Sequence, residues 1–158
     1  MVAKKPITIE EAYNRVASRC VLREYCRSDW YRKLQEAGLT AQQSGEVLDR
    51  LEEEKFIDEE RYARSFVHDK LHYDRWGRVK MTSALRQKAI SYEDIFTAIS
   101  SIDQEEYLNI LKDVLQKKAK GMKANSDYEL KQKLARFAAG KGFEPGLVFK
   151  VLDLEETF

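Results

Sequence analysis

Two histidines spaced four residues apart are the closest match in this sequence to a metal-binding motif. On a helix, His68 and His72 would share one face, and both imidazoles could reach a single metal ion. The intervening Asp69-Lys70-Leu71 lacks the glutamate of the HExxH motif, and the spacing offers no third ligand, although Asp69 or a distant carboxylate could approach. We therefore expect an exposed histidine pair rather than a metal site.

The two cysteines of the chain do not form a recognisable redox or zinc motif. Cys20 and Cys26 are separated by five residues, which is neither a C-x-x-C spacing nor that of a zinc knuckle. In a continuous helix they would lie about one and a half turns apart and point in different directions, which disfavours a disulfide. We expect two reduced thiols, as is usual for a cytoplasmic protein.

Three tyrosines could exchange protons with a substrate, because a phenol can act as a general acid or base. Tyr13, Tyr62 and Tyr107 recur, however, at equivalent positions beside expected helix starts. We therefore interpret them as buried or half-buried structural residues. Glycine-rich phosphate loops, Ser/His/Asp arrangements and paired catalytic carboxylates are not recognisable, so we predict a protein that is not an enzyme.

Four other aromatic residues could stack on nucleobases, as aromatic side chains do in proteins that bind single strands. They are Trp30, Tyr31, Tyr73 and Trp76. Trp76 is the better candidate for exposure, because it precedes Gly77 in an expected linker. Trp30 is expected to pack within the first part of the chain.

Positive charge is distributed unevenly along the chain. The totals are 28 Lys and Arg against 27 Asp and Glu, a net charge of +1, so the global charge indicates no particular partner. Residues 61–92, however, carry eight basic and two acidic residues, and residues 112–141 carry nine basic and three acidic residues. Basic clusters can contact acidic protein surfaces or nucleic-acid phosphates, although charges on helices are often only a solvated face.

Two sets of cations are therefore candidates for contact with a partner. The central basic set is Arg75, Arg78, Lys80, Arg86 and Lys88. The C-terminal basic set is Lys117, Lys118, Lys120, Lys123, Lys131, Lys133 and Arg136. Arg75 and Arg78 are the strongest candidates, because they flank Trp76-Gly77 in a linker and do not lie on the solvated face of a helix.

The elements that must position these residues are all expected to be helices. Two prolines and seven glycines in 158 residues suit helices better than a turn-rich β protein, and no alternating strand pattern of useful length appears. Helix starts are marked by capping pairs such as Thr40-x-x-Gln43, Asp103-x-x-Glu106 and Ser126-x-x-Glu129. The expected helices are 8–25, 28–37, 40–54, 58–74, 77–88, 91–101, 103–118, 126–139 and 144–155. No apolar run approaches the ~20 residues of a membrane span, and the N-terminus does not resemble a signal peptide.

A Glu-rich helix start with a tyrosine recurs three times along the chain. It reads Glu10-Glu11-Ala12-Tyr13, then Glu59-Glu60-Arg61-Tyr62, then Glu105-Glu106-Tyr107. Spacings of about 45 to 53 residues are typical of three-helix repeats. We predict an all-α fold of three tandem three-helix repeats, 1–57, 58–102 and 103–158, forming an elongated, curved array. Gly77 is expected to act as a pivot within the central repeat, and the linker 120–125 to be flexible.

The segment from Lys55 to Phe66 resembles the RecX family of regulatory proteins. It reads Lys55-Phe56-Ile57-Asp58-Glu59-Glu60-Arg61-Tyr62-Ala63-Arg64-Ser65-Phe66, where the family has Gly-Tyr-Leu/Ile-Asp-Asp-x-Arg-Tyr/Phe-Ala. Arg75, Gly77 and the ending Leu85-x-x-Lys88-Ala89-Ile90 extend the resemblance. The chain departs from the family pattern at Lys55-Phe56 and at Ala89, which stands where the family has a glycine that tolerates positive φ at a helix end.

The resemblance implies a regulator of RecA, the bacterial recombinase that polymerises on single-stranded DNA. RecX-like proteins lie in the groove of the RecA filament, suppress its ATPase and strand-exchange activities and limit filament extension. They have neither catalytic residues nor a cofactor, and they act in DNA repair by homologous recombination and in the SOS response. On this basis the expected partner is the RecA filament, the two basic sets are candidate contacts with RecA or DNA, and we expect a cytoplasmic monomer with no membrane contact.

Two other interpretations remain open from the residues alone. Three-helix units also underlie helix-turn-helix proteins, so the chain could be an autonomous module that binds single- or double-stranded DNA. It could also be a helical scaffold for a different protein partner.

Overall fold

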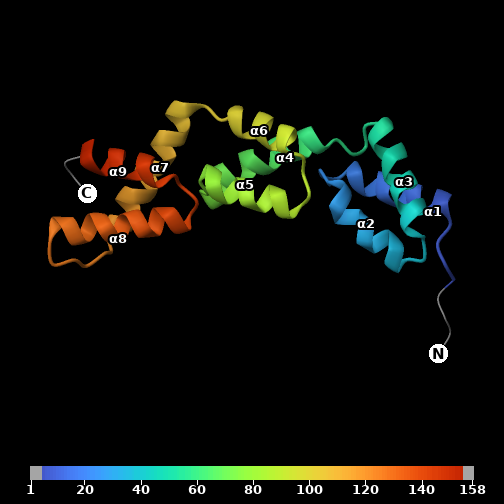
Figure 1. The fold of residues 1–158 in the computed structure, drawn as a ribbon, viewed down its shortest axis with the longest axis horizontal. Coiled ribbons are helices and arrows are strands. Elements are labelled where there is room, and N and C mark those ends of the chain that lie inside the picture. The colour runs from blue at the N-terminus through green and yellow to red at the C-terminus, as the bar shows by residue number, and fades with distance from the viewer. Residues whose placement is uncertain (1–4, 155–158) are drawn as a thin grey trace.

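The chain folds into nine α-helices, as expected, within residues 5–154, the part that this computed structural model describes (Figure 1). They are α1 (Ile9–Cys20), α2 (Arg27–Glu36), α3 (Ala41–Glu53), α4 (Glu59–Asp69), α5 (Arg78–Gln87), α6 (Tyr92–Ser100), α7 (Gln104–Ala119), α8 (Asp127–Gly140) and α9 (Pro145–Leu154). A short π-helix, η1 (Lys70–Asp74), continues α4. No strand occurs in this range, and no helix in it is long and apolar enough to cross a membrane.

Side-chain caps start most of these helices, because the first backbone N–H groups of a helix have no partner within it. Thr40 Oγ1 accepts from the Gln43 N–H at 3.0 Å, and Gln43 Oε1 accepts from the Thr40 N–H at 2.9 Å. Asp103 and Ser126 cap α7 and α8 by accepting from the Glu106 and Glu129 N–H groups, but neither glutamate returns a bond to the cap residue: Glu106 contacts His72, and Glu129 accepts from the Asn125 N–H. The predicted N-caps are therefore confirmed at all three positions, and the reciprocal bond is confirmed for Thr40 and Gln43.

The first helix is shorter than predicted, because it ends at Cys20 and not at residue 25. The apolar stripe of α1 stops there, and the Leu22 N–H bonds the Arg19 carbonyl at 3.0 Å in a tighter closing turn. Cys26 then starts α2, where its N–H donates to Asp29 Oδ2 at 3.0 Å. The expectation of two cysteines in one helix is wrong, although both thiols are free, as expected.

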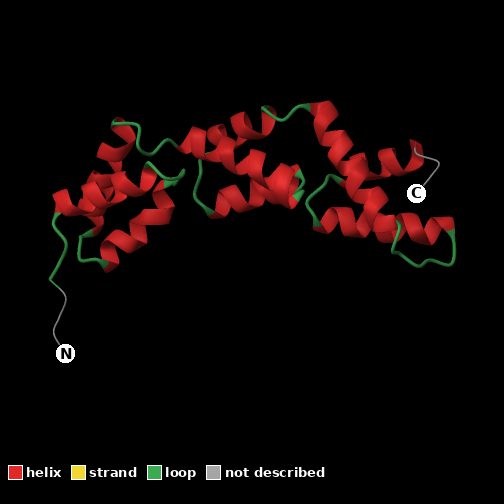
Figure 2. Ribbon diagram, turned by 180° about the vertical axis from the view of Figure 1, so that it is seen from behind, coloured by secondary structure: helices red, strands yellow, loops and turns green. Residues whose placement is uncertain are grey.

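The helices pack in threes in chain order and form an elongated array (Figures 1 and 2). Helix α3 packs on α1 and α2, α6 packs on α4 and α5, and α8 packs on α7 and α9. We call these groups the first, second and third units. The figures show the units side by side along the long axis, with the first unit at one end.

The buried residues of this array form two hydrophobic cores of unequal size. The first core belongs to the first unit and includes Leu48 and Leu51, both fully buried. The second core runs without interruption through the second and third units and includes Tyr107 and Phe143. Cys26 is the one buried residue of the first unit that lies in the second core. The second and third units are therefore joined by apolar packing, whereas the first unit has a core of its own.

The end of the α4 segment departs from regular helix geometry. The predicted helix 58–74 has the right extent, but its last five residues form η1. Arg75 follows in a left-handed conformation with φ 56°, and the Trp76 N–H donates to the Lys70 carbonyl at 2.9 Å. A π-helical turn rotates the side chains that follow it relative to a continuous α-helix. The η1 segment itself contacts α7 of the third unit, and the chain then continues into α5.

Candidate functional site

Arg78 lies at the junction between the second and third units. Its N–H donates to Tyr107 Oη at 3.0 Å, and its guanidinium carbon lies 3.8 Å from the centre of the Tyr107 ring. The guanidinium donates to Glu144 Oε2 at 2.9 Å through Nη1 and to Gln104 Oε1 at 2.6 Å through Nη2. Only 21% of the Arg78 side chain is exposed. Arg78 therefore joins the start of α5 to the starts of α7 and α9, and offers little surface to a partner.

Arg75 also contacts the third unit. Its Nη1 lies 2.5 Å from Asp113 Oδ2 on α7, and Lys117 Nζ lies 3.0 Å from the same oxygen. The hydrogen bond from Lys117, together with the positive charges of Lys117 and Arg75, holds the pKa of Asp113 below its ordinary value. One member of each basic set thus shares this carboxylate, and both are partly neutralised within the protein.

Gly77 and Gly142 bring the second and third units into backbone contact. The Gly77 N–H donates to the Lys141 carbonyl at 2.8 Å, and the Val79 N–H donates to the Gly142 carbonyl at 2.9 Å. A Cβ on Gly77 would lie 2.3 Å from the Gly142 carbonyl oxygen, and a Cβ on Gly142 would lie 2.3 Å from Lys80 Cβ. Gly77 is buried and its φ is an ordinary −84°. The expectation that Gly77 is a pivot is therefore wrong, because the residue permits a fixed close contact.

Trp76 is half-buried, which contradicts the expectation of an exposed indole. Lys70 Nζ lies 4.6 Å and Lys80 Nζ 4.5 Å from the centre of its ring. Lys141 Nζ donates to the Asp74 carbonyl at 2.6 Å next to this group. The Trp76 ring therefore makes cation–π contacts with two ammonium groups, and one of them, that of Lys80, belongs to the central basic set.

The other three candidate aromatics differ in their exposure. Trp30 is half-buried against Tyr25, with ring centres 5.1 Å apart, as expected for a residue that packs in the first unit. Tyr31 is 40% exposed and Tyr73 is 78% exposed. Of the four, Tyr73 alone presents most of its surface to solvent.

Lys88 lies at the opposite end of the second unit and contacts the first unit. Its Nζ lies 2.8 Å from Asp29 Oδ1, and this hydrogen bond raises the pKa of Lys88. Two further polar contacts cross the same junction: Arg61 Nε donates to Glu24 Oε1 at 2.7 Å, and the Arg27 N–H donates to Glu59 Oε2 at 3.4 Å. Pairs so distant in sequence leave no local signal, so they were not predicted.

The C-terminal basic set lies on α7, on α8 and on the loop that joins them. Lys118 Nζ lies 4.6 Å from the centre of the Phe137 ring, and Lys131 and Lys133 pair with acids one turn earlier on α8. Lys133 also donates to the Lys123 carbonyl at 2.8 Å, which ties the expected flexible linker to α8. Most members of this set thus have an intramolecular contact.

Four candidate cations remain exposed without an ion pair or ring contact among the described residues. They are Arg86, at the end of α5, with Lys120, Lys123 and Arg136 in the third unit. A partner can contact these four side chains without breaking an ion pair or a ring contact within the protein. The structure thus divides the two basic sets into residues that hold the units together and a smaller number that face solvent.

The histidine pair is engaged within the protein. The two rings lie 4.2 Å apart between centres, His72 Nδ1 lies 2.7 Å from the His68 carbonyl oxygen, and His72 Nε2 contacts the Glu106 carboxylate on α7. The Glu106 contact, followed by the His68 carbonyl, raises the pKa of His72. Within residues 5–154 no group of three His, Cys, Asp or Glu side chains is placed to hold a metal ion.

The three repeated tyrosines are buried, as the sequence predicted. The hydroxyls of Tyr13 and Tyr107 donate to Glu54 and Glu144, and an arginine guanidinium lies 3.8 Å from the centre of each of these rings. Burial, followed by the acceptor Glu144, raises the pKa of Tyr107, and burial likewise raises the pKa of Tyr62. The phenols therefore stay protonated near neutral pH, and those of Tyr13 and Tyr107 donate hydrogen bonds to carboxylates.

Comparison with protein families gives two matches, both within the second and third units. Residues 58–99 match the second three-helix domain of RecX, and residues 104–152 match the third three-helix domain of RecX. The two matches together cover more than half of the chain.

Individual relatives extend this similarity along the chain. Regulatory protein RecX of Clostridium tetani (strain Massachusetts / E88) is 32% identical over 115 residues, which are 72% of this chain and 52% of that protein. Regulatory protein RecX of Mycobacterium sp. (strain JLS) is 24% identical over 155 residues, 96% of this chain and 85% of that protein. The chain spans about half the length of the clostridial relatives that it matches.

The fold is also that of solved RecX structures. The crystal structure of RecX from Lactobacillus salivarius superposes with a TM-score of 0.83 at 19% identity, covering 93% of this chain and 97% of that one. A second crystal structure, of regulatory protein RecX, gives a TM-score of 0.82 at 24% identity, covering 92% of this chain and 73% of that one. Similarity at this level of identity establishes the all-α repeat architecture.

Proposed function

The chain belongs to the RecX family of regulatory proteins, and from this premise we propose that it regulates the RecA recombinase by binding and not by catalysis. In this proposal it lies in the groove of the RecA filament on single-stranded DNA and inhibits ATPase activity, strand exchange and filament extension. It acts as a cytoplasmic monomer in DNA repair by homologous recombination. The repeats 1–57, 58–102 and 103–158 are the proposed domains.

The observation that carries this proposal is the shared core of the second and third units. A groove that winds around a filament presents the same surface at regular intervals, and an elongated repeat protein can match it with successive units. The second and third units contact each other through buried residues such as Tyr107 and through Arg78. Their relative orientation is therefore fixed before binding, which reduces the entropy lost on association.

The proposal includes both basic sets, and their internal contacts divide them into residues that stabilise the fold and residues that contact the partner. Arg75 and Arg78 join the second and third units and Lys80 contacts the Trp76 ring, whereas Arg86, Lys120, Lys123 and Arg136 are the proposed direct contacts. Lys88 joins the second unit to the first, and the remaining members of the C-terminal basic set have their partners within the third unit. Contacts of this kind should weaken as the salt concentration rises.

The test is the ATPase activity of RecA on single-stranded DNA. Substoichiometric amounts of this protein should lower the rate, because one molecule in the groove affects several RecA subunits. An unchanged rate over a wide range of protein concentrations would refute the proposal. A triple Lys120→Glu, Lys123→Glu and Arg136→Glu variant should inhibit less than the wild type at equal concentration.

A second candidate function is autonomous DNA binding, which is favoured by the unpaired cations of the α7–α8 region. In that case the protein should bind DNA without RecA, and each lost phosphate contact should reduce the slope of log K against log salt by about 1. An identical slope for the wild type and the triple variant would count against this surface as the DNA contact.

A further inference from the structure

Three ammonium groups from different elements converge where η1 ends. Lys70 Nζ lies 4.6 Å and Lys80 Nζ lies 4.5 Å from the centre of the Trp76 ring, and Lys141 Nζ donates to the Asp74 carbonyl at 2.6 Å. Lys70 belongs to η1, Lys80 to α5, and Lys141 follows the last residue of α8. They meet at the end of the second unit that faces the third (Figure 1).

One carboxylate pairs with these three charges. Asp74 Oδ2 lies 3.3 Å from Lys70 Nζ, whereas Lys80 and Lys141 pair with no carboxylate in the part of the chain that the structure describes. The acids of the third unit that face this junction are already paired with arginines. Like charges that are held together and partly shielded from solvent repel one another. The end of η1 therefore carries an excess of positive charge, which a further anion would offset.

The two lysines without a carboxylate keep hydrogen-bond donors for such an anion. An ammonium group has three donors, and Lys141 uses one of them on the Asp74 carbonyl, while the indole ring covers one side of Lys80 Nζ. A Cβ on Gly142 would lie 2.3 Å from Lys80 Cβ, so Lys80 lies beside the residue that follows Lys141. Both lysines are half-buried and already held in place, which reduces the side-chain entropy that an anion would cost them.

An exposed aromatic ring adjoins these lysines. Tyr73 precedes Asp74 in η1 and is 78% exposed, more than any other large hydrophobic side chain that is described. In proteins that bind single strands, aromatic rings stack on unpaired bases while cations contact the backbone. Each nucleotide of a single strand supplies both partners, a base for the ring and a phosphate for the ammonium groups. The combination favours single-stranded nucleic acid over an acidic protein segment.

We propose that the end of η1 is a contact site for single-stranded DNA, in which Lys80 and Lys141 bind a phosphate and Tyr73 stacks on a base. Lys70 neutralises Asp74, which limits the repulsion between this carboxylate and the strand. The η1 site, as we call Tyr73, Lys80 and Lys141, is separate from the exposed cations of the α7–α8 region. The inference rests on the proposed function, in which the chain lies beside the single-stranded DNA of a RecA filament.

The experiment measures binding of the full chain to a short, labelled oligothymidine without RecA, by fluorescence anisotropy at several salt concentrations. We expect the double variant Lys80→Gln/Lys141→Gln to weaken binding about tenfold or more, and to reduce the slope of log K against log salt by about 0.7 for each lost phosphate contact. The matched control is Arg15→Gln/Arg19→Gln, which removes two exposed charges from α1 in the first unit. Equal losses in the two double variants would show a general effect of charge and would overturn the assignment.

A second variant tests the ring without changing the charge. Tyr73→Ser should weaken binding of the single strand about tenfold and leave binding of a duplex of the same length unchanged, because paired bases are not free to stack on the ring. The matched control is Tyr92→Ser, which removes a 72% exposed ring from α6. Both tyrosines are mostly exposed, so both variants should keep the wild-type stability. Wild-type affinity of Tyr73→Ser for the single strand would refute the base contact.

Parallel assays of RecA ATPase separate this inference from the proposed function. If the wild type inhibits RecA but the Lys80→Gln/Lys141→Gln variant binds oligothymidine as tightly as the wild type, the η1 site is wrong and the proposed function survives. If that variant loses affinity for RecA filaments alone, the lysines bind an acidic protein surface and the inference is again wrong. If the wild type leaves RecA unaffected while oligothymidine binding depends on Lys80, Lys141 and Tyr73, the proposed function fails and the η1 site remains.

Discussion

Lys55 and Ala89 adopt a backbone conformation that their side chains disfavour. Their φ angles are 67° and 60°, and each residue follows a helix end, as Gly38 does after α2 and Gly142 after α8. In the left-handed region a Cβ crowds the neighbouring carbonyl, at a cost of about 1–2 kcal/mol, and glycine has no such cost. Ala89, which departs from the glycine of the family pattern, thus has a positive φ, and Lys55 shares it.

We expect Lys55→Gly and Ala89→Gly each to raise the free energy of unfolding by about 1 kcal/mol, since relief of strain exceeds the entropy gained by the unfolded chain. Urea denaturation followed by circular dichroism measures this change. The control is Ala139→Gly in the exposed part of α8, which should lower stability by about 0.5–1 kcal/mol. Equal effects at Ala89 and Ala139 would contradict the argument.

Two arginines of the central basic set should separate stability from binding. Arg78→Ala removes a guanidinium that contacts Glu144, Gln104 and the Tyr107 ring, and should lower the free energy of unfolding by about 2 kcal/mol. Arg86→Ala removes an exposed side chain and should change it by less than about 0.5 kcal/mol. Under the proposed function, Arg86→Ala should nevertheless weaken filament binding, and comparable unfolding curves for the two variants would refute the division of roles.

At the scale of the elements, the helices could be predicted and their contacts could not. Capping pairs such as Thr40 and Gln43 act within four residues, so their sequence pattern is sufficient to locate a helix start. The role of Gly77 depends on a residue 65 positions later, Gly142, and no local pattern reports that contact. The same holds for Arg75, whose partner Asp113 belongs to the next unit. The sequence therefore located the basic residues, but it did not show which of them hold the units together and which face solvent.

The contact of Gly77 with the loop between α8 and α9 gives an element-scale prediction. In Gly77→Ala the new Cβ would lie 2.3–2.4 Å from Gly142 and Phe143 backbone atoms, which cannot move aside as a flexible side chain can. We expect a loss of about 3 kcal/mol or more in the free energy of unfolding. Gly45→Ala in α3 meets no atom within 4 Å and should stabilise by about 0.5–1 kcal/mol. A Gly77→Ala variant with wild-type stability would show that the two units can separate at this point.

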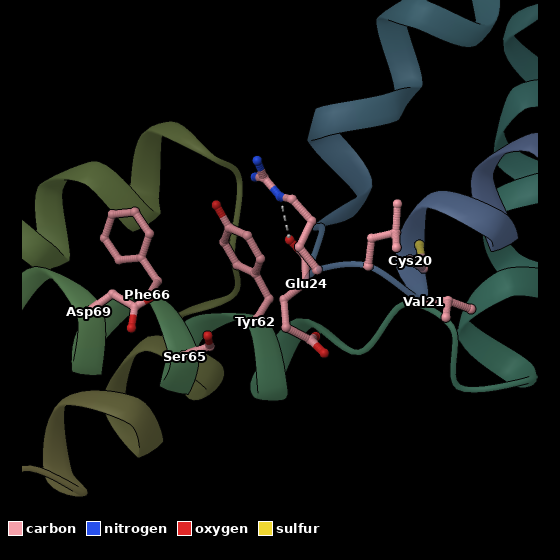
Figure 3. A pocket seen from close by; sticks show the side chains of 9 residues that line it. Cys20, Val21, Glu24, Tyr62, Ser65, Phe66 and Asp69 are labelled. Carbon is pink, nitrogen blue, oxygen red and sulfur yellow. Dashed lines mark hydrogen bonds between the residues drawn. The ribbon is translucent and has the colours of Figure 1, made fainter.

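At the scale of the whole molecule, the array has two hydrophobic cores of unequal size. The second and third units share a core, whereas the first unit joins them mainly through polar contacts: Lys88 with Asp29, Arg61 with Glu24, and Arg27 with Glu59. Polar contacts near solvent contribute less than apolar burial and respond to salt and pH. We therefore expect the orientation of the first unit to respond to salt and pH, and an open cleft lies at that junction between residues 20–24 and the face of α4 that carries Tyr62 and Phe66 (Figure 3).

Glu59 makes this junction sensitive to pH. Burial, with the nearby negative charges of Glu52 and Asp94, raises the pKa of its carboxyl from 4.5 to about 7, although the Arg27 N–H and charge act in the opposite direction. Between about pH 4.5 and 7 the folded protein keeps a proton that the unfolded chain has released, so the contribution of Glu59 to stability falls as the pH rises through this window.

Glu59→Gln keeps the acceptor for Arg27 and removes the charge. It should match the wild type at pH 4 and exceed its free energy of unfolding at pH 8 by roughly 1–2 kcal/mol, allowing for screening by solvent. Glu60→Gln, whose carboxylate pairs with Arg64 at the surface, is the control and should gain nothing at pH 8. Parallel pH profiles of unfolding for the wild type and Glu59→Gln would show that Glu59 is ionised without cost, and that the junction does not respond to protons.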